Sequence, residues 1–400
     1  MRLPVLSATT LALSTRALAD TNNITDAATT QSRALTAANT LQTWYNSATG
    51  IWNTCGWWNG ANCMTTLANL AALDIDDTFN DIARSVFANT FAVAATVSNP
   101  IPAKGNDPAD YLSSNGTGYY PATDGVPTGA ANTSIWLDGS YDDDLWWGLA
   151  WVAAYDVTQN ADYLDLAEGI FYHLSNAWPS KCGNGGIDSN YEHVYVGAIA
   201  NELFLSLAAH LANRAEDSAF YLDWADRQWT WFRDSGLINE NNTINDGLTN
   251  DCTNNGQTVW SYNQGVILGG LVELHQAMND DSDSSNSTYL DAAAEIAQGA
   301  ITELADDNYV IREVCEPANC APDRTQFKGI FMRNLKVLHA ASPNDTYAKV
   351  INASAESIWA NDRNDANGLG VVWTGPVDAA VVDASTHSSA LDALVAVIEK

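Results

Sequence analysis

Basic residues are scarce in this sequence. Only 17 Lys and Arg stand against 48 Asp and Glu, which gives a formal net charge of −31 at pH 7. Nucleic acids and anionic membrane surfaces are bound through basic patches, so this balance argues against both as partners. An acidic chain of this kind is typical of soluble secreted proteins, including proteins that work in an acidic medium.

Long apolar runs are also missing. After residue 19, no stretch approaches the roughly 18 uninterrupted apolar residues of a membrane helix, so we expect no membrane span. Residues 1–19 match a signal peptide, because Arg2 precedes a modest apolar core and Ala17-Leu18-Ala19 stands before Asp20. We expect residues 20–400 to form a single domain. The chain ends without the hydrophobic tail of a lipid-anchor signal, which favours a freely secreted protein.

Cysteine is limited to six residues, and neither a Cys-x-x-Cys pair nor a His pair with zinc-ligand spacing occurs. We therefore expect no metal site and no cofactor. In a secreted chain, six cysteines indicate three disulfides. Local spacing favours Cys55–Cys63 and Cys315–Cys320, which leaves Cys182–Cys252 as the third pair.

Acceptor sequences for N-glycosylation are frequent, as in secreted eukaryotic glycoproteins. They occur at Asn23, Asn115, Asn132, Asn241, Asn286, Asn344 and Asn352. We therefore expect a glycoprotein of the extracellular space or the cell wall. Separately, we expect the protein to be a monomer.

Helical periodicity dominates the chain, and strand-like alternation is nearly absent. An irregular stretch with Pro, Gly and Asn runs from about residue 99 to 140, a length that indicates a functional or disordered loop. The pattern predicts helices near residues 26–48, 61–72, 77–95, 141–157, 161–176, 195–213, 217–235, 261–277, 288–305, 325–341, 345–362 and 384–398. The fold class is therefore all-α.

From residue 141 onward, helices that are apolar all round alternate with helices that are apolar on one face. An apolar helix must be buried on all sides, whereas a one-faced helix covers a core from outside. Six hairpins, each with one helix of either kind, close into an (α/α)6 toroid. An open solenoid is the alternative, but no sequence repeat of the expected period occurs. We expect the ligand site in the concave mouth at one end of the inner ring.

One stretch combines acids with an apolar helix. Asp142, Asp143 and Asp144 precede a segment that has almost no polar face, and carboxylates are rarely buried without a partner or a purpose. Ser140 followed by acids is also an ordinary helix start, because Ser caps free N–H groups and acids complement the macrodipole. Three consecutive acids between Tyr141 and Trp146-Trp147 favour a functional site.

Aromatic and polar residues precede or begin several of the other inner helices. Sugar rings present apolar C–H faces to aromatic side chains, and glycosidic bond cleavage uses two carboxyl groups that flank the bond. The candidates for sugar binding are Trp57, Trp58, Asn59, Tyr141, Trp146, Trp147, Tyr262, Asn263 and Gln264. Each single tryptophan is also compatible with an ordinary core position. Adjacent Asp residues have Cα atoms about 3.8 Å apart, which favours the short carboxyl separation of retaining glycosidases.

The order of these motifs resembles glycoside hydrolase family 76, the endo-α-1,6-mannanases and their fungal cell-wall relatives. The matching segments are Gly56-Trp57-Trp58-Asn59, Tyr141-Asp142-Asp143 with Trp146-Trp147, Ala198 to Phe204, Ser261 to Val266, and Phe327 to Phe331. The resemblance implies an (α/α)6 toroid that acts on α-mannan or a mannose-containing wall glycan with retention. It implies Asp142 as nucleophile and Asp143 as acid/base, with Asp144 as a bystander or cap.

The resemblance leaves three functions open: an endo-acting hydrolase, a wall transglycosylase on mannose-containing glycans or anchors, and a non-catalytic glycan-binding toroid. Residues 187–197 depart from the family, because the aromatics that relatives carry after a Gly-Gly pair are replaced here by Ile187-Asp188-Ser189-Asn190. Among single residues, Glu202 is a candidate for ordering a loop or binding sugar. His193 and His387 are more typical of structural positions, and Asp280 to Asp283 of a solvated acidic turn.

Overall fold

The computed structural model describes residues 27–100, 132–278, 287–317, 320 and 322–399. The expected signal peptide, much of the irregular 99–140 stretch and the acidic turn at 280–283 lie outside these residues. The described part contains twelve α-helices, one short β-hairpin and two 3-10 turns. None of the described helices is both long and apolar enough to cross a bilayer.

The helix bounds follow the expected periodicity closely. The helices are residues 27–42, α2 (Trp57–Ala71), α3 (Asp77–Val97), α5 (Tyr141–Thr158), α6 (Ala161–Ser175), α7 (Ala198–Ala212), α8 (Ser218–Asp234), α9 (Ser261–Met278), α10 (Ser287–Leu304), α11 (Phe327–Ala341), α12 (Asp345–Asn361) and α13 (Ala384–Ala396). Strands β1 (Tyr45–Asn46) and β2 (Ile51–Trp52) pair antiparallel in the segment after residue 42, where helix was expected to continue. The 3-10 turns are η2 (Thr133–Trp136) and η3 (Pro322–Arg324).

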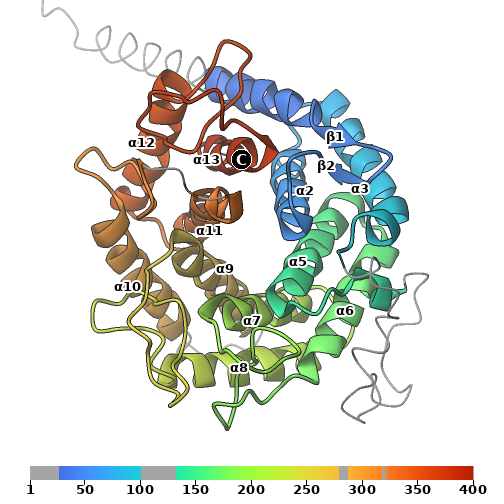
Figure 1. The fold of residues 1–400 in the computed structure, drawn as a ribbon, viewed down its shortest axis with the longest axis vertical. Coiled ribbons are helices and arrows are strands. Elements are labelled where there is room, and N and C mark those ends of the chain that lie inside the picture. The colour runs from blue at the N-terminus through green and yellow to red at the C-terminus, as the bar shows by residue number, and fades with distance from the viewer. Residues whose placement is uncertain (1–26, 101–131, 279–286, 318–319, 321, 400) are drawn as a thin grey trace, which may run out of the picture.

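The helices form two concentric rings (Figure 1). The inner ring consists of α2, α5, α7, α9, α11 and α13; each packs against the next, and α13 packs against α2 to close the ring. The helix at 27–42 and α3, α6, α8, α10 and α12 lie outside it. The expected (α/α)6 toroid is therefore confirmed.

Composition explains which helices are inside. Nearly every residue of α7 and α13 is buried, whereas α8 buries only the face that carries Tyr221, Trp229 and Phe232. Because an outer helix returns the chain between successive inner helices, all six inner helices run in the same direction. Their first turns therefore meet at one end of the ring.

The expected disulfides are confirmed in two cases out of three. Cys182 is bonded to Cys252 and Cys315 to Cys320. The predicted Cys55–Cys63 bond is wrong for this structure, in which the two sulfur atoms are 3.4 Å apart and both thiols are free. The spacing correctly placed the two residues next to each other, because Cys63 lies one and a half turns into α2 and Cys55 directly before it.

Close approach of inner helices depends on glycine. A Cβ atom on Gly265 of α9 would lie 2.5 Å from the Phe331 Cα atom of α11, a distance that real Cβ atoms do not tolerate. A Cβ atom on Gly270 of the same helix would lie 3.2 Å from the Ser206 Cα atom of α7, which small shifts can relieve.

We expect Gly265→Ala to lower the free energy of unfolding by about 1–3 kcal/mol, because overpacking a helix contact forces backbone shifts. Gly270→Ala is the matched control, since it gains the same helix propensity, about 1 kcal/mol, with a milder contact. Urea unfolding followed by circular dichroism measures both. Equal stability of the two variants would contradict the role of Gly265 in ring closure.

Candidate active site

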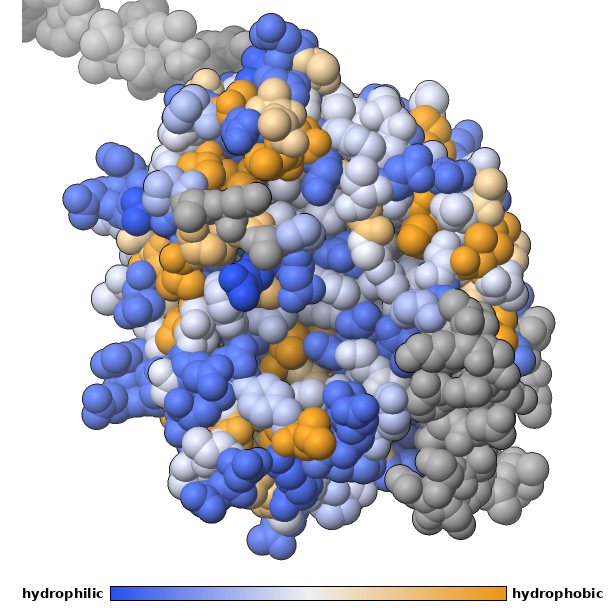
Figure 2. Space-filling view, viewed as in Figure 1, coloured by the Kyte–Doolittle hydropathy of each residue, from blue (hydrophilic) through white to orange (hydrophobic). Residues whose placement is uncertain are grey.

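The first turns of four inner helices form one continuous surface at the end of the ring where these helices begin. The Trp58 ring of α2 stacks on the Trp146 ring of α5, with centroids 5.9 Å apart. Phe327 of α11 lies 6.3 Å from the Trp58 ring and 3.7 Å from the Tyr262 ring of α9, nearly parallel to the latter. Figure 2 shows the face of the molecule that carries the loops before the inner helices. A hollow lies near the middle of this face and is rimmed largely by hydrophilic side chains.

The start of α5 brings its acids into this mouth in different environments. Asp142 and Asp143 are partly exposed, whereas Asp144 is fully buried. The side chain of Ser140 does not cap the helix, although its position in the sequence would allow this. Its hydroxyl instead donates a hydrogen bond to the Asp142 carboxylate at 2.9 Å. The serine therefore stabilises the ionised form of Asp142.

Burial raises the pKa of both partly exposed acids, but the groups around them act differently on the two pKa values. Burial raises the pKa of Asp142, but the Ser140 hydroxyl and the N–H groups of the first helical turn lower it again. For Asp143, burial and then the charges of Asp138 and Asp142 all act in one direction and hold the pKa well above its usual range. The pKa of Asp143 is therefore raised further than that of Asp142, and a difference in this direction is what acid–nucleophile chemistry needs.

Asp144 faces inward and fixes the loop before the helix. Its Oδ1 atom accepts a hydrogen bond from the backbone N–H of Asp138 at 2.8 Å, and burial raises its pKa well above the usual range. Its Oδ2 atom is buried without a hydrogen-bond partner among the described residues. Asp144 therefore anchors the loop at residue 138.

The predicted sugar-binding residues divide into exposed and buried members. Trp58 and Tyr262 are partly exposed at the mouth, whereas Tyr141 and Trp146 are buried, with 6% and 3% of their surface exposed. Trp57 and Trp147 are buried and pack on each other at 4.6 Å, within a cluster that includes Trp136 and Trp151. For Trp57 and Trp147, the expectation of sugar contact is corrected to a core role.

The buried amides support the site from beneath. Asn59 bonds to the side chain of Gln326 and to the N–H of Gly56 at the start of α2. Gln264 bonds to both backbone groups of Ile244 and so ties α9 to the loop before it. Asn263 is fully buried, with both polar atoms lacking a partner among the described residues. The expectation that these three side chains contact sugar is also corrected, because none is accessible.

Trp57-Trp58-Asn59 lies on a helix rather than in the loop where it was expected, because α2 begins at Trp57. Adjacent residues of a helix point about 100° apart. For this reason Trp58 is partly exposed at the mouth while its neighbour Trp57 is buried; Trp146 and Trp147 are both buried. The helix was predicted to start near residue 61, a few residues too late to show which of the two tryptophans is exposed.

The altered segment 187–197 is attached directly to the start of α5. The N–H of Tyr141 donates to the Ser189 carbonyl at 2.9 Å, and the N–H of Tyr191 donates to the Gly139 carbonyl. Asp188 is buried and pairs with His193 at 2.9 Å, so His193 has a structural partner as expected.

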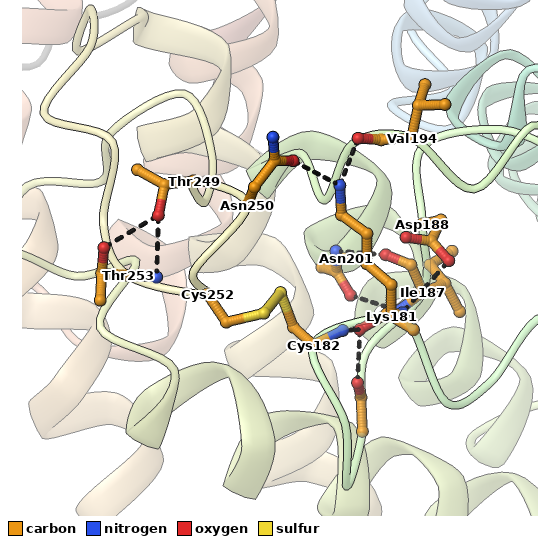
Figure 3. The surroundings of a disulfide bond; sticks show 12 residues. Lys181, Cys182, Ile187, Asp188, Val194, Asn201, Thr249, Asn250, Cys252 and Thr253 are labelled. Atoms are coloured by element: carbon orange, nitrogen blue, oxygen red, sulfur yellow. Dashed lines mark hydrogen bonds between the residues drawn. A yellow bond between two sulfur atoms is a disulfide. The ribbon is translucent and has the colours of Figure 1, made fainter.

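The same segment is braced from its other side, as Figure 3 shows. Cys182–Cys252 joins the loop before α7 to the loop before α9, and Asn201 holds both backbone groups of Ile187. The Lys181 amine bonds to Asn250 at 3.2 Å and to the Val194 carbonyl. The rim of the mouth is therefore cross-linked covalently and by hydrogen bonds.

Two further single-residue expectations have definite outcomes. His387 is fully buried and bonded through both ring nitrogens to backbone groups, so its structural role is confirmed. Glu202 is fully buried on α7, has no hydrogen-bond partner among the described residues, and has a pKa raised well above the usual range by burial. Its charge is one of the causes that raise the pKa of Tyr262 at the mouth, but the buried side chain itself is not accessible to a sugar.

The motif analysis missed Asp138. This residue is partly exposed, and its charge is one of the causes that hold the pKa of Asp143 above its usual range. Burial raises the pKa of Asp138 to about 6. The signal available in the sequence is the Asp138-Gly139-Ser140 turn directly before the acids, where an Asp commonly starts a turn.

No group of three or more His, Cys, Asp or Glu side chains in the described residues is arranged to hold a metal ion. A cavity of about 310 Å³ lies deeper in the ring, below Trp146 and toward the ends of the inner helices. Part of its charged lining is paired: Arg214 forms ion pairs with Asp156 and Glu273, and Arg333 forms one with Asp392. The acids of the mouth are not part of it.

Fold and site together define a six-hairpin helical toroid with a carboxyl cluster and an aromatic surface in its mouth. This is the arrangement that glycosidic bond chemistry requires. The sequence profile of glycosyl hydrolase family 76 matches residues 24–399. The chain belongs to this family.

Curated relatives are fungal proteins. The chain is 26% identical over 279 residues to the mannan endo-1,6-alpha-mannosidase DFG5 of Candida albicans, covering 64% of this chain and 60% of the relative. It is 30% identical over 220 residues to DCW1 of the same species, which covers 50% of this chain and 47% of the relative. The aligned regions thus span about half of the length of these relatives.

Solved structures share the fold. The GH76A alpha-1,6-mannanase from Salegentibacter superposes with a TM-score of 0.69 at 21% identity, covering 92% of this chain and 98% of that one. Dfg5 from Chaetomium thermophilum, in complex with glucosamine, gives 0.70 at 20% identity and covers 92% of this chain and 90% of that one. An inactive variant of the Salegentibacter enzyme, with two neighbouring aspartates replaced, binds alpha-1,6-mannotetrose and gives a TM-score of 0.70 at 19% identity, covering 92% of this chain and 98% of that one.

We expect Asp144→Ala to lower the free energy of unfolding by about 1–3 kcal/mol, because the N–H of Asp138 then loses its buried acceptor. Asp144→Asn keeps an oxygen at the Oδ1 position and is expected to be close to the parent. Urea unfolding of both variants measures the difference. An Asn variant as unstable as the Ala variant would contradict the anchoring role of this hydrogen bond.

Proposed function

We propose that this protein is a retaining glycoside hydrolase that cleaves α-1,6-mannosidic linkages within mannan. The observation that carries the proposal is the pair of adjacent carboxyl groups, Asp142 and Asp143, at the mouth of a family 76 toroid, where the pKa of Asp143 is raised further than that of Asp142. The names of the fungal relatives, mannan endo-1,6-alpha-mannosidases, supply the substrate class. The neighbouring aspartates replaced in the inactive mannotetrose-bound variant of the Salegentibacter enzyme agree with a paired role.

In the proposed mechanism, Asp142 is the nucleophile. Its carboxylate attacks the anomeric carbon of the mannose residue while Asp143 gives its proton to the departing glycosidic oxygen. The resulting glycosyl ester is opened by water, from which Asp143 removes a proton as the water oxygen attacks the same carbon. Two displacements restore the starting configuration, the free Asp142 carboxylate and the proton on Asp143.

The aromatic surface has a separate task in this proposal. Trp58, with its partly exposed ring, and Tyr262 offer flat faces on either side of Phe327. Sugar C–H groups pack on such faces, while the surrounding hydrophilic rim accepts hydroxyl groups. We infer that these two rings hold mannose residues next to the acid pair.

We further propose that the protein acts outside the cell or in the cell wall. Two disulfides and the strongly acidic composition support this location. The signal peptide, the sequon occupancy and the monomeric state remain predictions.

The deciding experiment compares reducing-end release from linear α-1,6-mannan by the parent, Asp142→Asn and Asp143→Asn. We expect release by the parent and a loss of at least about 100-fold in each variant, since a positioned acid/base alone contributes about 10²–10⁴-fold. Asp77→Asn, an exposed acid at the start of the outer helix α3, removes the same charge and is expected to retain activity. The anomer formed first, read by proton NMR, tests retention.

Two results would replace the proposal. Longer products formed only when a mannoside acceptor is added would identify a transglycosylase, because an acceptor hydroxyl then takes the place of water. Binding of mannan that survives both Asn substitutions, with no product from the parent, would identify a non-catalytic glycan-binding toroid.

A further inference from the structure

Two aromatic rings of the mouth, Tyr262 and Phe327, are stacked on each other although they belong to different inner helices. Their centroids are 3.7 Å apart and their planes are within 10° of parallel. Tyr262 is the second residue of α9, and Phe327 is the first residue of α11. Whatever fixes the starts of these two helices relative to each other therefore also fixes the stack.

A chain of polar contacts connects the start of α9 to the start of α11. The backbone N–H and the hydroxyl of Ser261 both donate hydrogen bonds to the Glu313 carboxylate, at 3.0 and 2.7 Å. The backbone N–H of Glu313 donates to the Oε1 atom of Glu316 at 2.9 Å. The same Oε1 atom pairs with the Lys328 amine at 2.5 Å. The contacts thus run from Ser261 to Lys328 through two glutamates.

These contacts and the ring stack form a closed circuit. Ser261 directly precedes Tyr262, and Lys328 directly follows Phe327. The two rings meet at the mouth, while the residues beside them are joined in the interior, where Ser261 is fully buried. The rings and the buried contacts therefore constrain the same two helix starts.

The buried Lys328 amine has several partners. The side chains of Lys328 and Glu316 are each 2% exposed, and Glu313 is 3% exposed. Besides its pairing with Glu316, the amine donates to the Val371 carbonyl at 2.6 Å and lies 4.2 Å from the centroid of the Trp373 ring. A buried ion pair is weak evidence for stability, whereas fixing one arrangement of the groups around it is its best-attested use.

Glu313 acts on a helix start that also has a second attachment. A helix leaves its first N–H groups without partners inside the helix, and a carboxylate complements the charge of this end. Glu313 accepts one such N–H group, from Ser261. Gln264 ties the same turn to the backbone of Ile244. The turn is therefore held at two points, and the Glu313 contact leads on to α11.

We propose that Glu313, Glu316 and Lys328 are positioning residues, which hold the Tyr262 and Phe327 rings in the stacked geometry that a sugar ring requires. The inference rests on the proposed function, in which Tyr262 holds a mannose residue. The three positioning residues touch neither the substrate nor the acid pair in this scheme. Their effect is therefore on recognition and not on the chemical step.

The first test compares KM and kcat on linear α-1,6-mannan for the parent, Glu313→Ala and Glu313→Gln. The Ala variant removes the acceptor of Ser261, so its KM is expected to rise about tenfold at nearly unchanged kcat, because binding alone is weakened. The Gln variant keeps an oxygen that accepts one of the two hydrogen bonds, and its KM is expected to lie between those of the parent and the Ala variant. An unchanged KM in Glu313→Ala, or a fall in kcat without a rise in KM, overturns the inference.

Glu273→Ala is the matched control. Glu273 lies on the same helix α9 near its other end, its side chain is 12% exposed, and it pairs with Arg214 at 2.9 Å. Its removal deletes a shielded glutamate with a hydrogen-bonded partner while the start of α9 keeps its contacts. The KM of this variant is expected to equal that of the parent. A rise as large as in Glu313→Ala would assign the effect to general destabilisation and overturn the inference.

A second measurement does not depend on the substrate. Protons that lie over an aromatic ring resonate upfield, so the ring protons of Tyr262 report its stacking on Phe327. We expect upfield Tyr262 signals in NMR spectra of the Tyr-labelled parent, assigned by their absence in Tyr262→Phe. They are expected to move toward the ordinary Tyr position in Glu313→Ala and to stay in place in Glu273→Ala. This result supports the positioning role even if mannan is not cleaved, whereas unchanged signals in a folded Glu313→Ala overturn it whatever the substrate.

The α11 end of the circuit is tested by the double variant Lys328→Met/Glu316→Gln. Removing both charges leaves no unpaired buried ion, which single removal of the lysine would do. The Tyr262 signals are expected to move in the same direction as in Glu313→Ala. Signals that stay at the parent position in the folded double variant would contradict the part assigned to Lys328 and Glu316.

Discussion

The crowding of carboxyl groups at the start of α5 is the constraint on which the site depends. Asp138, Asp142, Asp143 and Asp144 lie within seven consecutive positions of the chain and are removed from bulk water to different degrees. Six parallel inner helices direct their N-termini toward this region, and each carries about half a positive elementary charge. The pKa of Asp143 is nevertheless raised well above its usual range, so burial and mutual repulsion outweigh the helix dipoles. The protein tolerates the acids by protonating some of them, and this protonation is what a general acid needs.

The helix contacts that close the ring also position the residues of the site. The helices α2 and α5 meet through two tryptophan pairs, Trp58 with Trp146 and Trp57 with Trp147. One pair forms part of the mouth surface, and the other fills the core directly behind it. Glycines at Gly265 and Gly329 let the neighbouring helices approach to backbone contact. A shift in any of these helices would therefore move the aromatic surface and the acids together.

The sequence was sufficient for the fold because each helix carries its own evidence of burial. Apolar residues on all faces mark α7 and α13 as inner helices without knowledge of any contact. The site was less predictable, since exposure depends on helix rotation. A start at Trp57 instead of residue 61 decides that Trp58 faces the mouth and Trp57 the core. Asp138 was missed for a related reason: its role depends on a turn that folds back on the helix, and periodicity carries no information on turns.

Chemistry and recognition occupy different parts of the mouth. The acids belong to the first turn of α5 and the loop before it, fixed by Ser140 and Asp144. The rim belongs to loops such as 187–197, which are braced by Cys182–Cys252 and by Asn201. In that segment Asp188 pairs with His193. The hydrogen bonds from the N–H groups of Tyr141 and Tyr191 that join the segment to the start of α5 use backbone atoms on both sides. These backbone bonds do not depend on which side chains the rim carries, so under the proposed function the rim could change its glycan contacts while the start of α5 stays in place.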